Sequence, residues 1–296
     1  MGQVQANGIT IEYEQYGDPS GEPLLLVMGL GGQLTDWHDG FVEELVARQF
    51  HVTAFDNRDS GLSTEFDWEP PHPRKAFLKT MAKRPLEAGY TLVDMAADAA
   101  ALLDVLGIGS AHVVGMSMGG MIAQQLTIDH PERVRSLTSI MSNPGDGKNG
   151  RATGKTLAFM ARQPAPTLEN AVERSIALWE LIAGPHWAAD THRPLAEASI
   201  ARSFRPAGTA RQTIAIMASP DRTEALRRVA APTLVIHGLV DTLVKPSGGV
   251  ATANAVPGAR LLMFPDMGHD MPAPRWHEMA DAIRQNADRS GVSAAA

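Results

Sequence analysis

Three side chains of this sequence have the types, and the order along the chain, that nucleophilic catalysis by a serine requires. Ser117, Asp241 and His269 each follow an apolar run of strand length. A serine hydroxyl is a weak nucleophile near neutral pH, so it needs a base within hydrogen-bond reach and an acid that orients that base. Histidine suits the base because its unperturbed pKa is about 6.5. We therefore predict Ser117 as the nucleophile, His269 as the base and Asp241 as the acid.

The residues around Ser117 fit a sharp turn from a strand into a helix. Glycine stands two positions before it and two positions after it, in the run Gly-Met-Ser-Met-Gly. The elements that flank such a turn pass close together and leave room only for very small residues. This pattern alone is weak evidence for a nucleophile. Here a strand pattern at 111–115 precedes it and a helical pattern follows, which strengthens the prediction.

Two other acidic residues compete with Asp241 for the role of the acid. Asp266 lies three residues before His269 and would have to fold back toward it, and Asp146 follows a predicted strand at 134–141. His237, just inside the strand before Asp241, is expected to pack or hydrogen-bond behind the site. The choice of Asp241 rests on the chain order serine, acid, histidine with a helical insertion before the acid.

A tetrahedral intermediate carries negative charge that fixed N–H groups must stabilise, and the loss of one such donor typically costs about 3 kcal/mol. The N–H of Met118, at the start of the helix after Ser117, is the first expected donor, helped by the helix dipole. The N–H of Leu30, in the loop Gly29-Leu30-Gly31-Gly32 after an apolar strand, is the second.

A substrate pocket is predicted from apolar residues near these strand ends. Methionine adapts to irregular apolar shapes, although ordinary core packing explains the methionines equally well. The two tryptophans belong to a helical segment and either face the site or hold that segment together. The predicted pocket residues are Met28, Gly29, Met116, Met141, Trp179 and Trp187.

The elements that carry these side chains alternate as strand and helix, which predicts a mostly parallel sheet with helices on both faces. A hairpin is expected at 3–16, around Asn7-Gly8. Expected strands follow at 23–28, 51–55, 111–115, 134–141, 232–238 and 260–264, with helices at 41–48, 90–106, 118–128 and 273–288.

From about 143 to 221 no apolar strand is found, only helical patterns at 156–162, 168–181, 194–204 and 209–217. We therefore predict a core domain made of 1–143 and 222–296, interrupted by a helical cap, or lid, at 144–221. The loop 56–63, rich in charge and turn formers, is expected to be structural, held by bonds from its side chains to backbone.

Composition narrows the function classes. The 296 residues include no cysteine, which excludes disulfides, thiolate metal sites and a cysteine nucleophile. A net charge of -7 without a Lys/Arg run disfavours nucleic-acid and anionic-membrane partners. No secretory signal and no membrane-spanning stretch are recognised, so a cytoplasmic protein is expected. The chemistry needs neither a metal nor an organic cofactor, and the oligomeric state stays open.

With these motifs in hand, the sequence resembles the α/β-hydrolase fold family from about residue 8 to 288. The resemblance rests on the 115–119 turn, the Asp-Asn-Arg-x-x-Gly-x-Ser loop at 56–63, the Gly-x-x-Asp at 238–241 and the Gly-His pair at 268–269. Carboxylesterase-like members similar to aclacinomycin methylesterase are the nearest subgroup. Many relatives have His-Gly where this chain has Met28-Gly29.

The resemblance and the triad together predict an enzyme that cleaves a small-molecule carboxylic ester through an acyl-enzyme. A bulky polyketide, macrolide or methyl ester is the expected substrate class. One alternative keeps the triad but hydrolyses a C–C bond or uses peroxide as cofactor-free haloperoxidases do. A second alternative is a ligand-sensing module on a hydrolase fold, which an intact triad disfavours.

Overall fold

The computed structural model describes residues 1–72, 75–76, 79 and 84–291. The predicted core domain, 1–143 and 222–296, includes residues 73–74, 77–78, 80–83 and 292–296, which lie outside the described residues. Its centre is an eight-stranded sheet with the order β1-β2-β4-β3-β5-β6-β7-β8. The strands are β1 (Gly2–Ala6), β2 (Ile9–Tyr16), β3 (Glu22–Val27), β4 (Phe50–Phe55), β5 (Ala111–Met116), β6 (Val134–Ile140), β7 (Thr233–Gly238) and β8 (Arg260–Phe264). All eight lie where strands were predicted, to within one or two residues at each end.

The sheet is antiparallel at one edge and parallel elsewhere. β1 and β2 form the predicted hairpin, and β2 pairs antiparallel with β4. Asn7 (φ 48°) and Gly8 (φ 75°) both adopt positive φ, as a two-residue hairpin turn requires. The pairs from β4 through β8 are all parallel. Their carboxyl ends therefore meet at one edge of the sheet, where the predicted reactive side chains follow.

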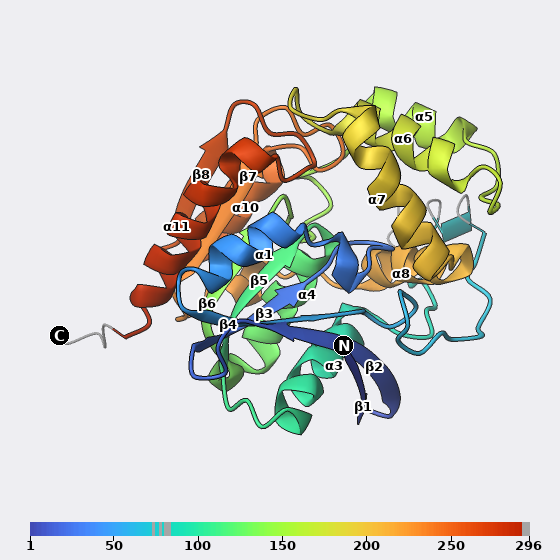
Figure 1. Cartoon of the computed structure of the whole chain (residues 1–296). Helices are drawn as coiled ribbons and strands as arrows, with labels where there is room; N and C mark the ends of the chain where they lie inside the picture. Colours follow the sequence, from blue (N-terminus) through green and yellow to red (C-terminus); the bar gives the residue numbers. More distant parts are fainter. Residues whose placement is uncertain (73–74, 77–78, 80–83, 292–296) are drawn as a thin grey trace.

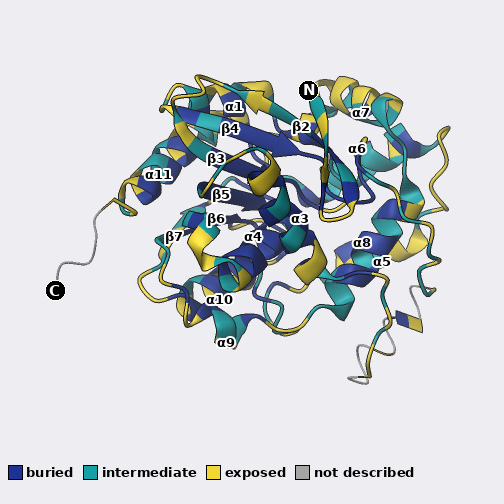
Figure 2. Cartoon of the chain, turned by 90° about the horizontal axis from the view of Figure 1, so that it is seen from below, coloured by how far each residue is buried: buried dark blue, intermediate teal, exposed yellow. Residues whose placement is uncertain are grey.

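Helices cover both faces of the sheet, and a hydrophobic cluster fills each interface (Figures 1 and 2). α3 (Leu92–Val105) and α4 (Met118–Asp129) pack on one face. α1 (Asp39–Val46) and α11 (Trp276–Asp288) pack on the other. β3 and β5 contribute alternate side chains to both clusters, which is why their sequences are continuous apolar runs.

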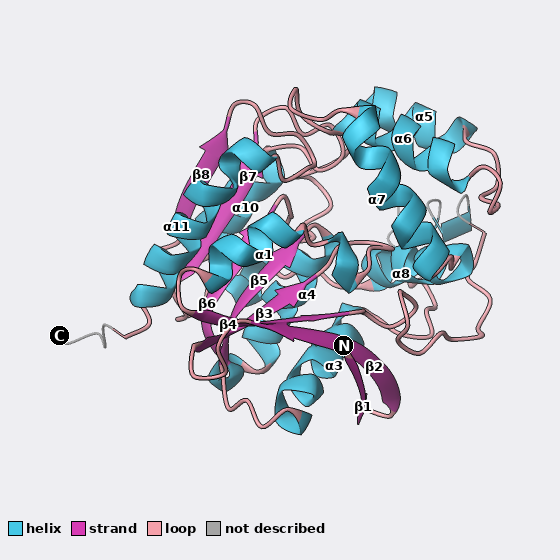
Figure 3. Cartoon of the chain, in the orientation of Figure 1, coloured by secondary structure: helices cyan, strands magenta, loops and turns pink. Residues whose placement is uncertain are grey.

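Between β6 and β7 the chain forms helices only: α5 (Gly154–Arg162), α6 (Ala171–Ile182), α7 (Ala189–Arg202), α8 (Pro206–Ala218) and the short α9 (Thr223–Leu226). α5, α6 and α7 lie together at one end of the molecule, away from α11 (Figure 3). The prediction that a helix begins at Pro194 is wrong, because α7 begins five residues earlier and contains this proline. The N–H of His192 and the hydroxyl of Thr191 both donate to Ala188 O, which stabilises the earlier start.

Candidate active site

Ser117 stands at the junction of β5 and α4 in a strained backbone conformation. Its φ of 56° and ψ of -119° are unusual for a residue with a side chain. The turn is possible because a Cβ at Gly115 would lie 2.1 Å from Gly119 O, and one at Gly119 would lie 1.9 Å from Val27 O. Both predicted glycines are therefore required by close backbone contact, and the turn lifts the Ser117 side chain beyond the sheet.

His269 joins Ser117 to Asp241 by two hydrogen bonds. The His269 Nδ1–H donates to Asp241 Oδ2 at 2.7 Å, and the Ser117 hydroxyl donates to His269 Nε2 at 3.0 Å. This assignment of the proton follows because a carboxylate accepts but does not donate. The side chains of Asp241 and His269 are 0% and 6% exposed. The structure thus brings together the three residues predicted from the sequence.

The environment of Asp241 keeps it ionised. Burial raises the pKa of Asp241, but the charge of His269 and hydrogen bonds from His237, His269 and Val244 N–H outweigh this and lower the pKa to about 2. Its second oxygen accepts the N–H groups of Leu243 and Val244 at 2.9 and 2.8 Å. Its carboxylate is thus held in one orientation, as the orienting acid of a triad must be.

The two rival acids are engaged elsewhere. Asp266 accepts from His186 Nε2 at 2.7 Å and forms an ion pair with Arg275 at 2.9 Å, at a partly exposed position. Asp146 accepts the N–H groups of Lys148 and Asn149, each at 2.8 Å, and so closes its own turn. Asp241 is therefore the acid that the geometry pairs with His269.

The N–H groups of the loop after β3 differ in their hydrogen-bond partners among the described residues. The N–H of Gly31 donates to Gln212 Oε1 at 2.8 Å, and that of Gly32 donates to Gly29 O at 3.1 Å. No hydrogen bond from the Leu30 N–H is found in the described part of the chain. A Cβ at Gly29 would lie 3.2 Å from Ser117 Cβ, so this loop passes directly beside the serine. The Met118 N–H belongs to the first turn of α4, where helical N–H groups lack intrahelical partners.

The side chains of the loop at 56–63 bond to the backbone, as expected, and several of these bonds are to the loop that contains Leu30. The Asn57 side chain donates to Met28 O at 2.9 Å, and the Ser60 hydroxyl donates to Gly32 O at 2.6 Å. Asp56 Oδ1 accepts the N–H of Leu34 at 2.7 Å. Backbone geometry near the serine thus depends on side chains that follow the neighbouring strand β4.

Ser142 supports the serine turn and was not recognised in the sequence. Its hydroxyl donates to Ser117 O at 2.8 Å. It follows Met141, which has an unusual φ of 41° at the end of β6. The only signal was its place, a small polar residue directly after a buried strand, and serine at such a position is too common to stand out.

The predicted pocket residues fall into separate places. Met28 and Met141 are buried in the cluster beneath α1 and α11, and Met116 is partly buried against that cluster. Trp179 of α6 and Trp187 both pack on the His192 ring of α7, with ring centroids 5.3 and 5.8 Å apart. These tryptophans thus pack on His192 of α7, within the 144–221 segment. Gly29, in contrast, lies close to Ser117.

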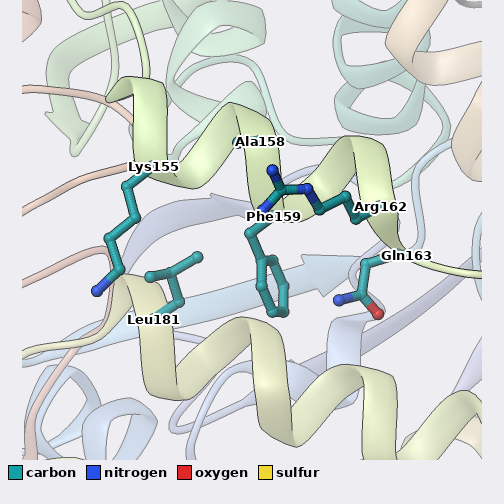
Figure 4. Close-up of a pocket in the computed structure, with 6 residues that line it drawn as sticks. All are labelled: Lys155, Ala158, Phe159, Arg162, Gln163 and Leu181. Carbon is teal, nitrogen blue, oxygen red and sulfur yellow. The ribbon is translucent and has the colours of Figure 1, made fainter.

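A separate cavity lies between α5 and α6 (Figure 4). Its volume is about 370 Å³. None of the predicted pocket residues lines it; its lining consists of Lys155, Ala158, Phe159, Arg162, Gln163 and Leu181. In the described residues, no group of three or more His, Cys, Asp or Glu side chains is arranged to hold a metal ion. No helix within the same residues is long and apolar enough to cross a membrane.

Known proteins share both the sequence pattern and the fold. The pattern of the α/β-hydrolase fold family matches residues 22–272. The chain is 32% identical to the rhodomycin D methylesterase DnrP of Streptomyces peucetius, covering 93% of this chain and 94% of the relative. It is 29% identical to BpoC of Mycobacterium tuberculosis H37Rv, provisionally named a non-heme bromoperoxidase, over 88% and 91% of the two chains. The crystal structure of BpoC superposes with a TM-score of 0.70 at 25% identity, over 95% and 96% of the chains.

A solved structure with lower identity has the same fold. The meta-cleavage product hydrolase of Pseudomonas fluorescens IP01 superposes with a TM-score of 0.73 at 20% identity, over 98% of both chains. The sheet order and the glycine-flanked serine between β5 and α4 agree with this fold. The family pattern covers most of the length of the chain, and we conclude that the protein belongs to the α/β-hydrolase fold family.

Proposed function

We propose that this protein is a serine hydrolase that cleaves a carboxylic ester through an acyl-enzyme. The observation that carries the proposal is the hydrogen-bonded chain from Ser117 Oγ through His269 to Asp241, at 3.0 and 2.7 Å. A serine activated in this way attacks acyl carbons, and the fold supplies a known setting for that chemistry.

In the first half of the reaction, Ser117 Oγ attacks the ester carbonyl carbon while His269 Nε2 takes the hydroxyl proton. The buried carboxylate of Asp241 stabilises the positive imidazole that results. Collapse of the tetrahedral intermediate breaks the C–O bond of the ester, and His269 returns the proton to the leaving alcohol. Water then attacks the acyl group with the same proton transfers, releasing the acid and free Ser117.

The N–H groups of Leu30 and Met118 are the proposed oxyanion donors. Support comes from the unpartnered Leu30 N–H in a loop that touches Ser117, and from the position of Met118 in the first turn of α4. Both donors are backbone groups, so methionine in place of histidine at position 28 does not remove them. The positive end of the α4 dipole adds to the stabilisation.

For the substrate we propose an uncharged, bulky ester such as the methyl ester of a glycosylated polyketide. The support is the relative whose name states rhodomycin D methylesterase activity, with matched coverage of both chains. We propose that the 144–221 segment acts as a cap over the site. The end of α6 lies against the histidine loop, since the His269 N–H donates to Ile182 O at 2.7 Å.

A panel of esters with intact-mass detection tests this function. We expect turnover of p-nitrophenyl esters and of at least one polyketide methyl ester, with an acyl adduct on Ser117 detected during turnover. Ser117→Ala is the control and should lose both the adduct and the activity. Ester turnover at the background rate by the purified wild-type protein would refute the proposal.

A second candidate is perhydrolysis, in which hydrogen peroxide replaces water in the attack on the acyl-enzyme and a peracid forms. The resemblance to BpoC favours it. Adding peroxide to the ester assay distinguishes the two functions. Peracid formation at a rate that exceeds ester hydrolysis would favour perhydrolysis, whereas peracid at a small fraction of the hydrolysis rate would favour the esterase.

A further inference from the structure

The backbone next to the proposed oxyanion donor is bonded to helix α8, far away in the sequence. The Gly31 N–H donates to Gln212 Oε1 at 2.8 Å. Gln212 Nε2 donates in turn to Arg58 O at 2.7 Å. The Gln212 side chain is fully buried. Its amide oxygen and its amide nitrogen each bond to the backbone of a different core loop, so both are satisfied. One side chain of the 144–221 segment thus bridges the loop after β3 and the loop after β4.

A second glutamine continues the connection to α7. Gln33, 3% exposed, donates to Ser199 O at 2.6 Å and to Ser203 O at 3.1 Å. Its Oε1 accepts from Arg202 Nη1 at 2.6 Å, and the same Arg202 group forms an ion pair with Asp56 at 2.9 Å. The loop between β3 and α1 is therefore bonded to two consecutive helices of the 144–221 segment.

The contact of α8 with Gly31 is also steric. Gly31 has a φ of 69°, and a Cβ at this position would lie 2.8 Å from Thr209 Oγ1 and 3.2 Å from Thr209 Cγ2. Thr209 lies one helical turn before Gln212 on α8, so both residues face the same loop. Helix α8 thus lies directly on the backbone that follows Leu30.

We infer that Gln212 is a positioning residue for the oxyanion hole. The Gly31 N–H and the Leu30 N–H belong to two consecutive peptide planes that meet at Leu30 Cα. The bond from Gln212 fixes the plane of the Gly31 N–H and so limits rotation of the plane that carries the Leu30 N–H. By this bond α8 holds the Leu30 N–H toward Ser117. The inference rests on the proposed function and goes beyond it, because it makes the geometry of the hole depend on the docking of α8.

The test replaces Gln212 by methionine, which keeps the side-chain length and apolar volume but removes the acceptor and the donor. The rate at which a fluorophosphonate labels Ser117 should fall about tenfold or more, because the phosphonyl oxygen uses the same donors. The inhibition constant of an alkyl boronic acid, which forms a tetrahedral adduct on the serine, should rise by a similar factor. KM for an ester should change less than twofold.

Thr213→Ala is the matched control, because Thr213 is the next residue on α8 and, among the described residues, its hydroxyl bonds within the helix to Thr209 O. Its labelling rate should stay within twofold of the wild type. Hydrogen exchange of the 28–34 backbone, followed by mass spectrometry, checks that Gln212→Met frees the Gly31 amide. Faster exchange there, combined with a labelling rate within twofold of the wild type, would overturn the inference.

A second pair of variants covers the case in which Gln212→Met does not fold. Gly31→Ala should slow labelling, since the new Cβ presses on Thr209. Adding Thr209→Ala removes both atoms that crowd this Cβ and should recover at least part of the labelling rate. The positive φ at residue 31 persists in the double variant, so recovery should be incomplete. A double variant no faster than Gly31→Ala would contradict the role of α8.

The labelling assay separates this inference from the proposed function. If the wild type reacts with the fluorophosphonate at Ser117 and Gln212→Met slows it, the positioning role stands even where no ester is hydrolysed. If the wild type hydrolyses esters and Gln212→Met hydrolyses them equally fast with a free Gly31 amide, the function stands and the positioning role fails.

Discussion

The serine turn and the outer helices of the 144–221 segment are built in opposite ways. In α4, ten residues from Met118 to Thr127 are buried, and the strands around it are covered on both faces. In α5 the only buried residue is Thr156, and in α7 it is Ala196. Leu157 and Met160 of α5 are 52% and 45% exposed. Close packing thus surrounds Ser117, whereas α5 and α7 bury few of their side chains.

From this difference we expect the closely packed part of the molecule to perform the proposed chemistry and the loosely packed helices to adapt to the substrate. Triad geometry is fixed by buried backbone contacts that tolerate little change. Helices with few buried side chains can be repacked at small cost, so we expect α5 and α7 to tolerate substitutions that change the preferred substrate. α8 belongs to the closely packed part, because its residues Arg211 and Gln212 are buried against the core loops.

The largest expected effect is on kcat, and it should differ between Asp241, which is buried beside His269, and Asp266, which is partly exposed. Asp241→Asn should lower kcat by about 10⁴-fold, because the asparagine no longer selects the His269 tautomer. Asp266 bonds to His186 and Arg275 in the described part of the chain, so Asp266→Asn should leave kcat within about threefold of the wild type. Steady-state ester kinetics measure both. If Asp266→Asn lowered kcat by several orders of magnitude and Asp241→Asn left it nearly unchanged, the assignment of the acid would be wrong.

A smaller effect is expected at the support of the serine turn. Ser142→Ala removes the hydroxyl that donates to Ser117 O, and kcat/KM should fall by about tenfold, the equivalent of one hydrogen bond. Ser136→Ala, in the strand β6 that precedes Ser142 and bonded to His112, is the control and should leave kcat/KM unchanged. Equal kinetics for the two variants would show that the turn holds its geometry without Ser142.

The ionised state of Asp241 predicts a pH dependence of stability. Its folded pKa of about 2 lies below the usual aspartate value of 3.8, so the stabilisation is complete above the unfolded pKa and is lost as pH falls toward 2. The unfolding free energy of the wild type minus that of Asp241→Asn should therefore drop by about 1 kcal/mol between pH 6 and pH 3. Urea titrations across this range measure it; parallel pH curves would contradict the low pKa.

The smallest expected effect concerns the loosely packed helices. Trp179→Ala loosens the contact between α6 and α7 through His192, and KM for a bulky ester should rise about threefold with kcat little changed. A short acetate ester, measured in parallel, should show no change in KM. A large loss of kcat for both esters would mean that these helices take part in the chemistry, which would remove the contrast between the two regions.

Much of the site was predictable because its signals are local. The glycines around Ser117 are demanded by backbone contacts within a few residues and with β3, the neighbouring strand. β3, β5 and β7 were predictable for a similar reason, since buried parallel strands need continuous apolar runs. The hairpin of β1 and β2 was marked instead by its Asn7-Gly8 turn. Helix α10 (Ser247–Ala255) has no counterpart among the predicted elements. Its sequence holds two glycines and little apolar periodicity, and one of them, Gly249, packs tightly on His237.

By itself, the sequence determined the order of the strands along the chain, the serine turn, and the presence of an acid and a histidine after later strands. Only the tertiary structure decided which aspartate meets His269, because Asp241, Asp266 and Asp146 all follow strand ends and differ only in what surrounds them. It also decided that Gln212 bonds to Gly31, a pair separated by 181 residues. No pattern along the chain marks such a bond, because it depends on where α8 docks once the sheet has formed.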